Sequence, residues 1–285
     1  MNRMRCYMNW LSLDGLGPFA ESPIIAIRAA AFDGIQFVDP LDAPALAEAR
    51  ALGLGVCGSH RINTPIDAAL IAQAAADTGL ECLTLHVGWG MESDDEGARL
   101  IEAVLDSSTR YTIPIYVETH RATLFQDMQR TVRFVTRFPD LRFNGDFSHW
   151  YTGSEMVYGG FESKLAYIQP VLERVRFLHG RIGNPGCIQV AVLRGDPAPY
   201  VSHFRTLWTR CFEAFLRDPA PQQSFMIFAP ELLAPSIYYA RTFKGAEESD
   251  RWEQSLLLAQ IARECFAEAE KNTDKEQAWH DDFRG

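Results

Sequence analysis

The sequence repeats one pattern along most of its length: a short apolar run, a turn, and a longer segment with apolar residues at helical spacing. Such alternation is typical of consecutive strand–helix units, in which parallel strands form one sheet and the helices cover it. Strands that are buried on both faces are continuously apolar, as residues 113–117 are. The pattern therefore predicts an α/β protein with a parallel sheet.

Eight apolar runs occur, and we expect a strand at each. They span residues 5–11, 34–38, 53–57, 82–87, 113–117, 141–143, 175–178 and 224–228. Eight strand–helix units that close into a barrel take about 250 residues, and the chain has 285. We therefore predict a single (β/α)₈ TIM barrel over residues 1–285, in which residues 271–285 form a polar C-terminal tail that frays or packs on another subunit.

The segments between the runs carry helix signals. Thr64 and Pro65 mark a helix start, and Thr123 with Gln126 predicts a capping box. We expect helices over residues 66–76, from about residue 93, and over residues 124–138, 161–174, 200–216 and 247–270. One long connection, residues 183–199, is interpreted either as the cover of a site or as a surface excursion.

Charge and composition exclude several functional classes. A formal net charge of −10 argues against a nucleic-acid partner, because that affinity rests on Lys and Arg. No run of about 18 apolar residues predicts a membrane span, and no apolar stretch of a signal peptide follows Met1. None of the six cysteines is spaced as CxxC, so we expect reduced thiols and a cytoplasmic protein.

Ionisable residues gather where the predicted strands end. They are Asp39, His60, His86, Glu118, His120, Asp146, His149, His179, Arg181 and Glu231. Five of the seven histidines of the chain are in this set, although strand ends make up only about a tenth of a barrel. Because barrel enzymes carry their chemistry at the carboxyl ends of the strands, this placement predicts a functional site at the mouth.

Four of these residues form a candidate metal site: Glu118, Asp146, His179 and Glu231. They follow four successive predicted strands. Buried carboxylates are costly unless they are paired or bound to a cation. Three carboxylates and one imidazole favour one divalent ion, Mn²⁺, Mg²⁺ or Co²⁺, over ions that prefer thiolates, with Zn²⁺ as a further candidate. The alternative is a barrel whose site has lost its ion.

Four segments around these residues resemble the strand-end motifs of the xylose-isomerase-like superfamily. The segments are Val117-Glu118-Thr119-His120, Asp146-Phe147-Ser148-His149, His179-Gly180-Arg181 and Pro230-Glu231. The chain resembles in particular the ketose 3-epimerases and the sugar phosphate isomerase/epimerase proteins, and the likeness covers nearly its whole length. It implies that the four positions hold the metal, that the two glutamates flank the substrate, and that His149 contacts substrate oxygens or the water on the metal.

The chain departs from the ketose 3-epimerases at two positions. These enzymes have a further Glu six residues after the first, where Leu124 stands, and an Arg six residues after the metal His, where Pro185 stands. Arg181 is a candidate replacement that reaches a substrate hydroxyl, carboxylate or phosphate, or else it forms a salt bridge with a carboxylate. The departures affect the substrate and leave the four metal positions intact.

The resemblance implies an isomerase or epimerase of carbohydrate metabolism that acts on a small sugar or cyclitol. A metal-bound carbonyl would acidify the neighbouring C–H, and Glu118 and Glu231 would act as the catalytic bases through an enediolate. His149, Arg181, His86, His120 and His60 are the candidate substrate-binding residues, although each histidine can instead orient a neighbour.

Several alternatives remain open at this stage. Loss of a hydroxyl from the same enediolate would make the protein a lyase of the inosose dehydratase type, and a sugar-binding barrel without catalysis is a third class. The related apurinic-site endonucleases need a basic DNA groove, which the net charge disfavours. Trp89, Trp150 and Phe228 either form an apolar wall for a sugar or belong to the core. Related barrels often pair, so a homodimer is a candidate assembly.

Overall fold

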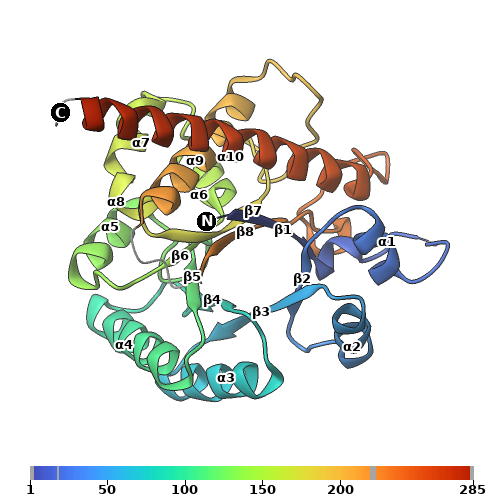
Figure 1. The fold of residues 1–285 in the computed structure, drawn as a ribbon, viewed down its shortest axis with the longest axis horizontal. Coiled ribbons are helices and arrows are strands. Elements are labelled where there is room, and N and C mark those ends of the chain that lie inside the picture. Colours follow the sequence, from blue (N-terminus) through green and yellow to red (C-terminus); the bar gives the residue numbers. More distant parts are fainter. Residues whose placement is uncertain (1–2, 18, 219–222, 283–285) are drawn as a thin grey trace.

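The structure is a computed structural model that describes residues 3–17, 19–218 and 223–282, with side chains up to residue 276. Eight parallel strands form a closed barrel in sequence order, which confirms the predicted (β/α)₈ fold (Figure 1). The strands are β1 (Arg3–Asn9), β2 (Gly34–Val38), β3 (Gly55–Ile62), β4 (Leu83–Val87), β5 (Ile115–Glu118), β6 (Phe143–Gly145), β7 (Val175–Gly180) and β8 (Phe225–Pro230).

Helices surround the barrel and follow each strand. They are α1 (Pro23–Ala29), α2 (Ala43–Ala51), α3 (Pro65–Thr78), α4 (Asp94–Tyr111), α5 (Met128–Arg137), α6 (Phe147–Gly153), α7 (Phe161–Tyr167), α8 (Gln169–Leu172), α9 (Pro199–Arg217) and α10 (Arg251–Asp282), with short 3-10 turns η1 (Trp10–Leu13) and η2 (Pro235–Ile237). The long helix α10 packs along α9 on the outside of the barrel (Figure 1). Among the described helices, none combines the length and apolar character that a membrane crossing requires.

The predicted strand bounds differ from the observed ones at most strands. The sixth strand, predicted at residues 141–143, is Phe143–Gly145, and the seventh continues past residue 178 to Gly180, so His179 lies inside it. The first strand ends at Asn9, because the Asn9 side chain accepts a hydrogen bond from the Leu11 amide and starts a 3-10 turn. The third strand begins at Gly55, since Gly53 has a positive φ of 72° and lies in the turn after α2. This strand continues to Ile62, so His60 lies inside it rather than after it.

The capping box predicted from Thr123 and Gln126 is wrong. Helix α5 begins at Met128, and the side chain of Asp127 accepts a 2.8 Å hydrogen bond from the Arg130 amide. Thr123 is buried and donates its hydroxyl hydrogen to the His120 carbonyl at 2.6 Å. Asp is the stronger N-cap residue, which explains why the helix starts four residues later than predicted.

Two other predicted helices have different bounds. The segment 161–174 forms α7 and the short α8, because Pro170 lacks the amide hydrogen that a continuous helix needs. Helix α10 begins at Arg251 rather than residue 247, since Glu247 lies in the small hairpin β9 (Thr242–Phe243)–β10 (Ala246–Glu247). The predicted polar tail continues α10 as far as Asp282, and residues 283–285 lie outside the described residues.

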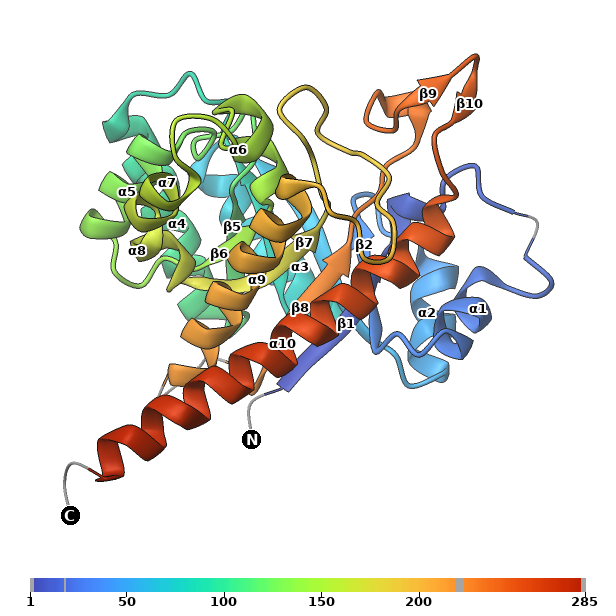
Figure 2. The same cartoon turned by 90° about the horizontal axis from the view of Figure 1, so that it is seen from above.

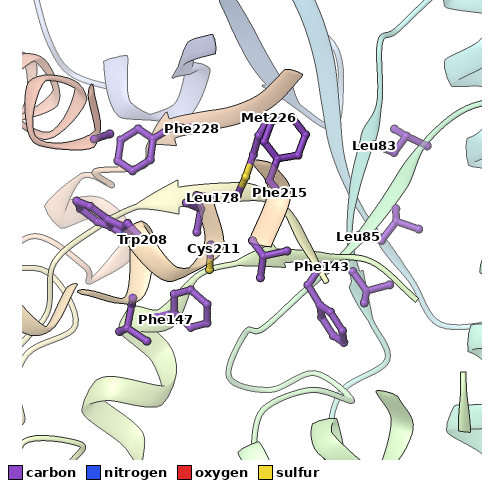
Figure 3. Close-up of a cluster of buried hydrophobic side chains, with 14 of the residues drawn as sticks. Leu83, Leu85, Phe143, Phe147, Leu178, Trp208, Cys211, Phe215, Met226 and Phe228 are labelled. Atoms are coloured by element: carbon purple, nitrogen blue, oxygen red, sulfur yellow. The ribbon is translucent and has the colours of Figure 1, made fainter. Parts of the chain in front are cut away.

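The core lies between the outer face of the barrel and the helices. Figure 3 shows Leu178, Met226 and Phe228 from neighbouring strands beside Trp208 and Phe215 of α9. The Trp208 and Phe228 rings meet edge to face with centroids 5.0 Å apart. Each such buried side chain contributes about 1.5–3 kcal/mol to folding. Trp150 and Phe228 therefore belong to the core, whereas Trp89 is half exposed.

The interior of the barrel is divided into an apolar and a polar layer. The apolar layer includes the buried side chains of Tyr7, Cys82, Tyr116 and Phe177. Two residues further along the chain from each of these side chains there is a buried polar one. The four polar residues are Asn9, Thr84, Glu118 and His179. Because side chains alternate along a strand, positions two apart face the same side. The strands thus close the barrel near their amino ends and present polar groups near their carboxyl ends.

Two long connections extend from the carboxyl end of the barrel, at the top of Figure 2. One joins β7 to α9, and the other carries the β9–β10 hairpin between β8 and α10. They contact each other, because Gln189 exchanges hydrogen bonds of 2.8 and 3.1 Å with the backbone of Leu233. The sequence left open whether the β7–α9 connection covers a site or is a surface excursion. In the structure this connection packs on the segment that follows Glu231.

Candidate metal centre and active site

Four residues from four neighbouring strands meet at the carboxyl end of the barrel. Glu118 ends β5, Asp146 follows β6, His179 lies in β7, and Glu231 follows β8. One potential ligand atom from each lies within 4.8 Å of the others, and all four residues are buried. The structure thus brings together the four residues that the sequence predicts as metal ligands.

His179 lies at the centre of this cluster. Its Nδ1 is 3.3 Å from Glu231 Oε2, 3.4 Å from Glu118 Oε2 and 3.9 Å from Asp146 Oδ2. Burial by itself would lower the pKa of His179, but the carboxylates of Glu231, Glu118 and Asp146 outweigh it and raise the pKa to about 9. One oxygen from each of three carboxylates therefore faces a single nitrogen, an arrangement that favours positive charge at this point.

A chain of amides fixes the orientation of the His179 ring. Its Nε2 is 2.9 Å from Gln36 Oε1, which also accepts a 2.9 Å hydrogen bond from Asn9 Nδ2. Gln36 Nε2 in turn donates to Thr84 Oγ1 at 2.9 Å. Because an amide oxygen only accepts, Nε2 carries a hydrogen, and Nδ1 of the neutral ring has its lone pair directed at the carboxylates.

Arg181 supplies a permanent positive charge at the site. Its guanidinium is fully buried and forms ion pairs with Asp146 and, at 3.1 Å, with Glu231 Oε2. Its Nε donates to Ser148 Oγ at 3.0 Å. The salt bridge that the sequence left as an alternative is therefore present, and a contact between Arg181 and substrate stays a prediction.

The donor set fits one divalent ion. Three carboxylates and one guanidinium leave two negative charges when His179 is neutral, since −3 + 1 = −2. Oxygen donors with a single imidazole suit Mg²⁺, Mn²⁺ or Co²⁺. Asn144 Nδ2 donates to Glu118 Oε2 at 3.0 Å, while Asn144 Oδ1 is buried without a hydrogen-bond partner in the described structure. An unsatisfied acceptor beside these carboxylates is costly, so the site is incomplete without a further group.

The environment separates the pKa values of the two glutamates. Burial opposes ionisation of Glu118, but His179 and His86 hold its pKa well below the usual range. Burial raises the pKa of Glu231, and His179 and Arg181 only partly offset this effect. Unequal proton affinities in two adjacent carboxyl groups are typical of acid–base sites.

Three histidines form a stack beside the cluster. The His86 and His120 ring centroids are 4.3 Å apart, and those of His120 and His149 are 3.7 Å apart. His86 Nε2 is 3.3 Å from Glu118 Oε2, and His149 Nε2 is 3.5 Å from Asp146 Oδ2. Burial, with the neighbouring His149, lowers the pKa of His120 to about 2. The stack thus places three imidazoles beside the carboxylates, with His86 and His120 partly exposed and His149 buried.

His60 does not join this stack among the contacts of the described residues. Its Nδ1 is 3.7 Å from Asp39 Oδ1. Asp39 is not the cap of α2, because the Asp42 side chain accepts a 3.0 Å hydrogen bond from the Ala45 amide. A role of His60 in substrate binding stays a prediction.

Sequence reasoning missed five residues of the site: Asn9, Gln36, Thr84, Asn144 and Tyr239. Four of them are single polar residues within apolar strand runs, which is a signal that the sequence did offer. Tyr239 lies in the connection after β8. Its hydroxyl is 3.2 Å from His120 Nε2, and the Arg181 guanidinium lies 4.7 Å from its ring centroid.

Comparisons with solved structures show the same fold in other proteins. A D-tagatose 3-epimerase-like protein matches with a TM-score of 0.58 and 11% identity over 96% of this chain and 99% of that chain. A probable 3-DHS dehydratase, AsbF from Bacillus anthracis, matches with a TM-score of 0.57 and 13% identity over 92% and 97%. The chain therefore shares the (β/α)₈ barrel fold of these proteins.

A third similar structure contains a metal ion. A xylose isomerase-like TIM barrel protein from Mycobacterium smegmatis, in complex with magnesium, matches with a TM-score of 0.54 and 13% identity over 92% of this chain and 97% of that chain. No protein-family model matches this sequence, and no curated protein matches it significantly. At these identities the likeness concerns the fold, so the chemistry must be argued from the site.

Proposed function

We propose that the protein is a divalent-metal-dependent isomerase or epimerase of small sugars or cyclitols. The observation that carries the proposal is the placement of one oxygen from each of Glu118, Asp146 and Glu231 around Nδ1 of His179. Mn²⁺, Mg²⁺ or Co²⁺ held by these four residues would supply Lewis-acid polarisation of a substrate carbonyl.

Glu118 and Glu231 are the proposed proton-transfer residues. Each has a second carboxylate oxygen besides the one that faces His179, so each can hold the site together and still accept a proton. Glu118, whose pKa is held below the usual range, is ionised and therefore available to accept the proton first. Glu231, with its raised pKa, is the better donor. Removal of a proton on one face of an enediolate and its return on the other face gives epimerisation.

The polar wall of the mouth suits a polyhydroxy substrate. His86, His120 and His149 stack together here, and an imidazole ring has nitrogens that donate or accept hydrogen bonds. These histidines, with Arg181 and His60, are the proposed substrate-binding residues. A cytoplasmic location and a homodimer remain predictions that rest on the sequence.

The test is turnover in Glu118→Gln and Glu231→Gln. Both proteins should fold, because glutamine keeps the shape of the side chain, and both should lose at least about 100-fold in kcat on a ketose or inosose that the wild-type protein converts. The screen uses purified protein loaded with Mn²⁺, Mg²⁺ or Co²⁺. Wild-type turnover in either variant, or in protein treated with a chelator, would rule the proposal out.

A lyase is the second candidate function. The similarity to a probable 3-DHS dehydratase, with a TM-score of 0.57, favours it. Both reactions begin with the same proton abstraction, and dehydration follows if a hydroxyl leaves from the carbon next to the enediolate. Mass analysis separates the two, because a dehydratase product is lighter by one water and an epimerase product has unchanged mass.

A further inference from the structure

Arginines line an open cavity at the amino end of the barrel. The cavity has a volume of about 400 Å³, which is within the range of small-molecule sites. Besides uncharged residues, its wall holds the carboxylates of Glu173 and Asp218 and four arginines, which are Arg142, Arg174, Arg176 and Arg217. The wall therefore has an excess of positive charge, in a chain whose formal net charge is −10.

The topology of the barrel explains why these arginines meet. Arg142 directly precedes β6, and Arg174 directly precedes the neighbouring parallel strand β7. The Phe143 amide, at the start of β6, donates to the Arg174 carbonyl at 3.0 Å. The other ends of the same two strands hold Asp146 and His179. The cavity and the proposed metal centre thus lie at opposite ends of the barrel.

Backbone carbonyls hold one nitrogen of each of three guanidinium groups. Nη1 of Arg142 donates to two carbonyls at 2.9 and 3.1 Å, and Nη1 of Arg174 donates to one at 2.8 Å. Nη1 of Arg176 donates to two carbonyls at 2.9 and 2.7 Å. A guanidinium has five N–H hydrogens, and a carbonyl has no net charge. These bonds therefore fix the arginines in place without neutralising them.

Two of the four arginines are neutralised by carboxylates. Arg176 is buried and forms an ion pair with Asp218. Arg217, which ends α9, has a nitrogen 2.8 Å from Glu276 Oε2 of α10. These two arginines support the fold at this end of the barrel and contribute little net charge to the cavity.

Arg142 and Arg174 supply the charge that carboxylates leave uncompensated. Within the described part of the chain, the Arg142 guanidinium bonds only to backbone carbonyls. Arg174 has Glu173 Oε2 at 3.8 Å, but both side chains reach solvent, and such pairs contribute little. Arg174 Nε is buried and has no hydrogen-bond partner among the described residues. A buried donor without a partner is costly, which indicates a missing acceptor.

The surroundings of Arg142 favour an added negative charge. Burial lowers the pKa of this arginine, and the nearby guanidinium groups of Arg176 and Arg174 lower it further. Asp218 and Asp140 raise the pKa but do not outweigh the other effects. An anion in the cavity would offset the repulsion among the three arginines, because it attracts each of them.

We propose that this cavity binds a small anion that carries a phosphate group, held chiefly by Arg142 and Arg174. Guanidinium groups bind phosphate through paired hydrogen bonds. A phosphate offers three acceptor oxygens and up to about two negative charges, so it satisfies several arginines better than one carboxylate does. The site does not depend on the proposed function, because no residue of the metal centre lines the cavity.

The experiment is calorimetric titration of the purified full-length protein with inorganic phosphate and with pyrophosphate at constant ionic strength. The wild-type protein should bind both, and Arg142→Gln and Arg174→Gln should each weaken the binding by at least about tenfold. Arg133→Gln is the matched control, because it removes the same charge from an exposed arginine that pairs with Asp94 outside the cavity. It should bind like the wild type. Acetate should bind at least about tenfold more weakly than phosphate.

Several outcomes would overturn the phosphate site. They are no binding to the wild type, wild-type affinity in both cavity variants, as phosphate bound through a metal ion would give, an equal loss in Arg133→Gln, and equal affinities for acetate and phosphate. Circular dichroism establishes that the compared proteins are folded. If a glutamine variant does not fold, the lysine variant at that position replaces it. Lysine keeps the charge but lacks the paired donors, so it should also bind phosphate more weakly, and unchanged affinity would equally overturn the site.

Discussion

Oε1 of Gln36 lies 2.9 Å from Nε2 of His179, at the carboxyl end of the barrel interior. This contact determines which nitrogen of the ring faces the three carboxylates. Gln36 is itself held by Asn9 on one side and Thr84 on the other, so its amide has little freedom to turn over. The amide chain therefore prepares His179 Nδ1 as a ligand before any ion arrives.

Loss of this contact should weaken ion binding. Gln36→Leu removes the acceptor for Nε2 and should lower the affinity for Mn²⁺ by about 10–100-fold. Gln36→Glu replaces the amide oxygen with a carboxylate oxygen that still accepts from Nε2, and this variant should bind the ion at least as tightly as the wild type. Calorimetric titration of protein freed of metal measures both. Equal affinities in wild type and Gln36→Leu would mean that the amide does not orient the ring.

Removal of the Arg181 charge should destabilise the protein when no ion is present. Arg181→Met leaves Asp146 and Glu231 buried without their guanidinium partner, and we expect a loss of about 3–5 kcal/mol in the free energy of unfolding. A saturating divalent ion should recover part of this loss, because it binds only the folded state. Urea unfolding with chelator and with Mn²⁺ measures the two values. If the loss in unfolding free energy is the same with and without the ion, then Arg181 and the ion do not neutralise the same carboxylates.

His120 should make the metal-free protein sensitive to mild acid. Its pKa is about 2 in the folded protein and about 6.5 in an unfolded chain, so the unfolded state binds more protons between these values. Stability from this group is present above pH 6.5 and is lost as the pH falls. Between pH 7.5 and 5.5 the wild type should lose about 1 kcal/mol more than His120→Asn in urea unfolding with chelator. Identical losses would show that His120 is readily protonated in the fold.

The revised start of α5 can be checked with a pair of alanine variants. Asp127→Ala removes the N-cap hydrogen bond to Arg130 and should cost about 1 kcal/mol in the free energy of unfolding. Gln126→Ala should cost less, since Gln126 is not a capping residue in this helix. Thermal or urea unfolding of the two proteins decides between the caps. A larger loss for Gln126→Ala would restore the capping box that the sequence suggests.

The number of strands and the location of the polar cluster were predictable because both depend on the order of residue types. Each strand run is mostly apolar, and parallel strands place their carboxyl ends on one rim. Glu118, Asp146, His179 and Glu231 therefore had to lie near one another once the barrel was assumed. Local bounds were less predictable, because Thr123 and Asp127 both offer a cap. In the structure Thr123 is buried with its hydroxyl on the His120 carbonyl, and Asp127, the stronger capping residue, starts the helix.

The supporting residues depend on contacts that a linear pattern does not encode. Gln36 and Asn144 stand alone in apolar strands, and the sequence does not say which face of the strand they occupy. Tyr239 reaches His120 from a connection 119 positions further along the chain. The strand face of Gln36 and Asn144 and the contact of Tyr239 with His120 do not follow from residue spacing in the sequence, because both depend on how the barrel closes.

The metal content of the purified protein tests the central claim most directly. Wild-type protein dialysed against Mn²⁺ and then against metal-free buffer should retain a divalent ion, and Asp146→Asn, folded by circular dichroism, should lose the ion held by the cluster around His179. A folded wild-type protein that retains no ion, or an Asp146→Asn protein that binds Mn²⁺ as tightly as the wild type, would contradict the account.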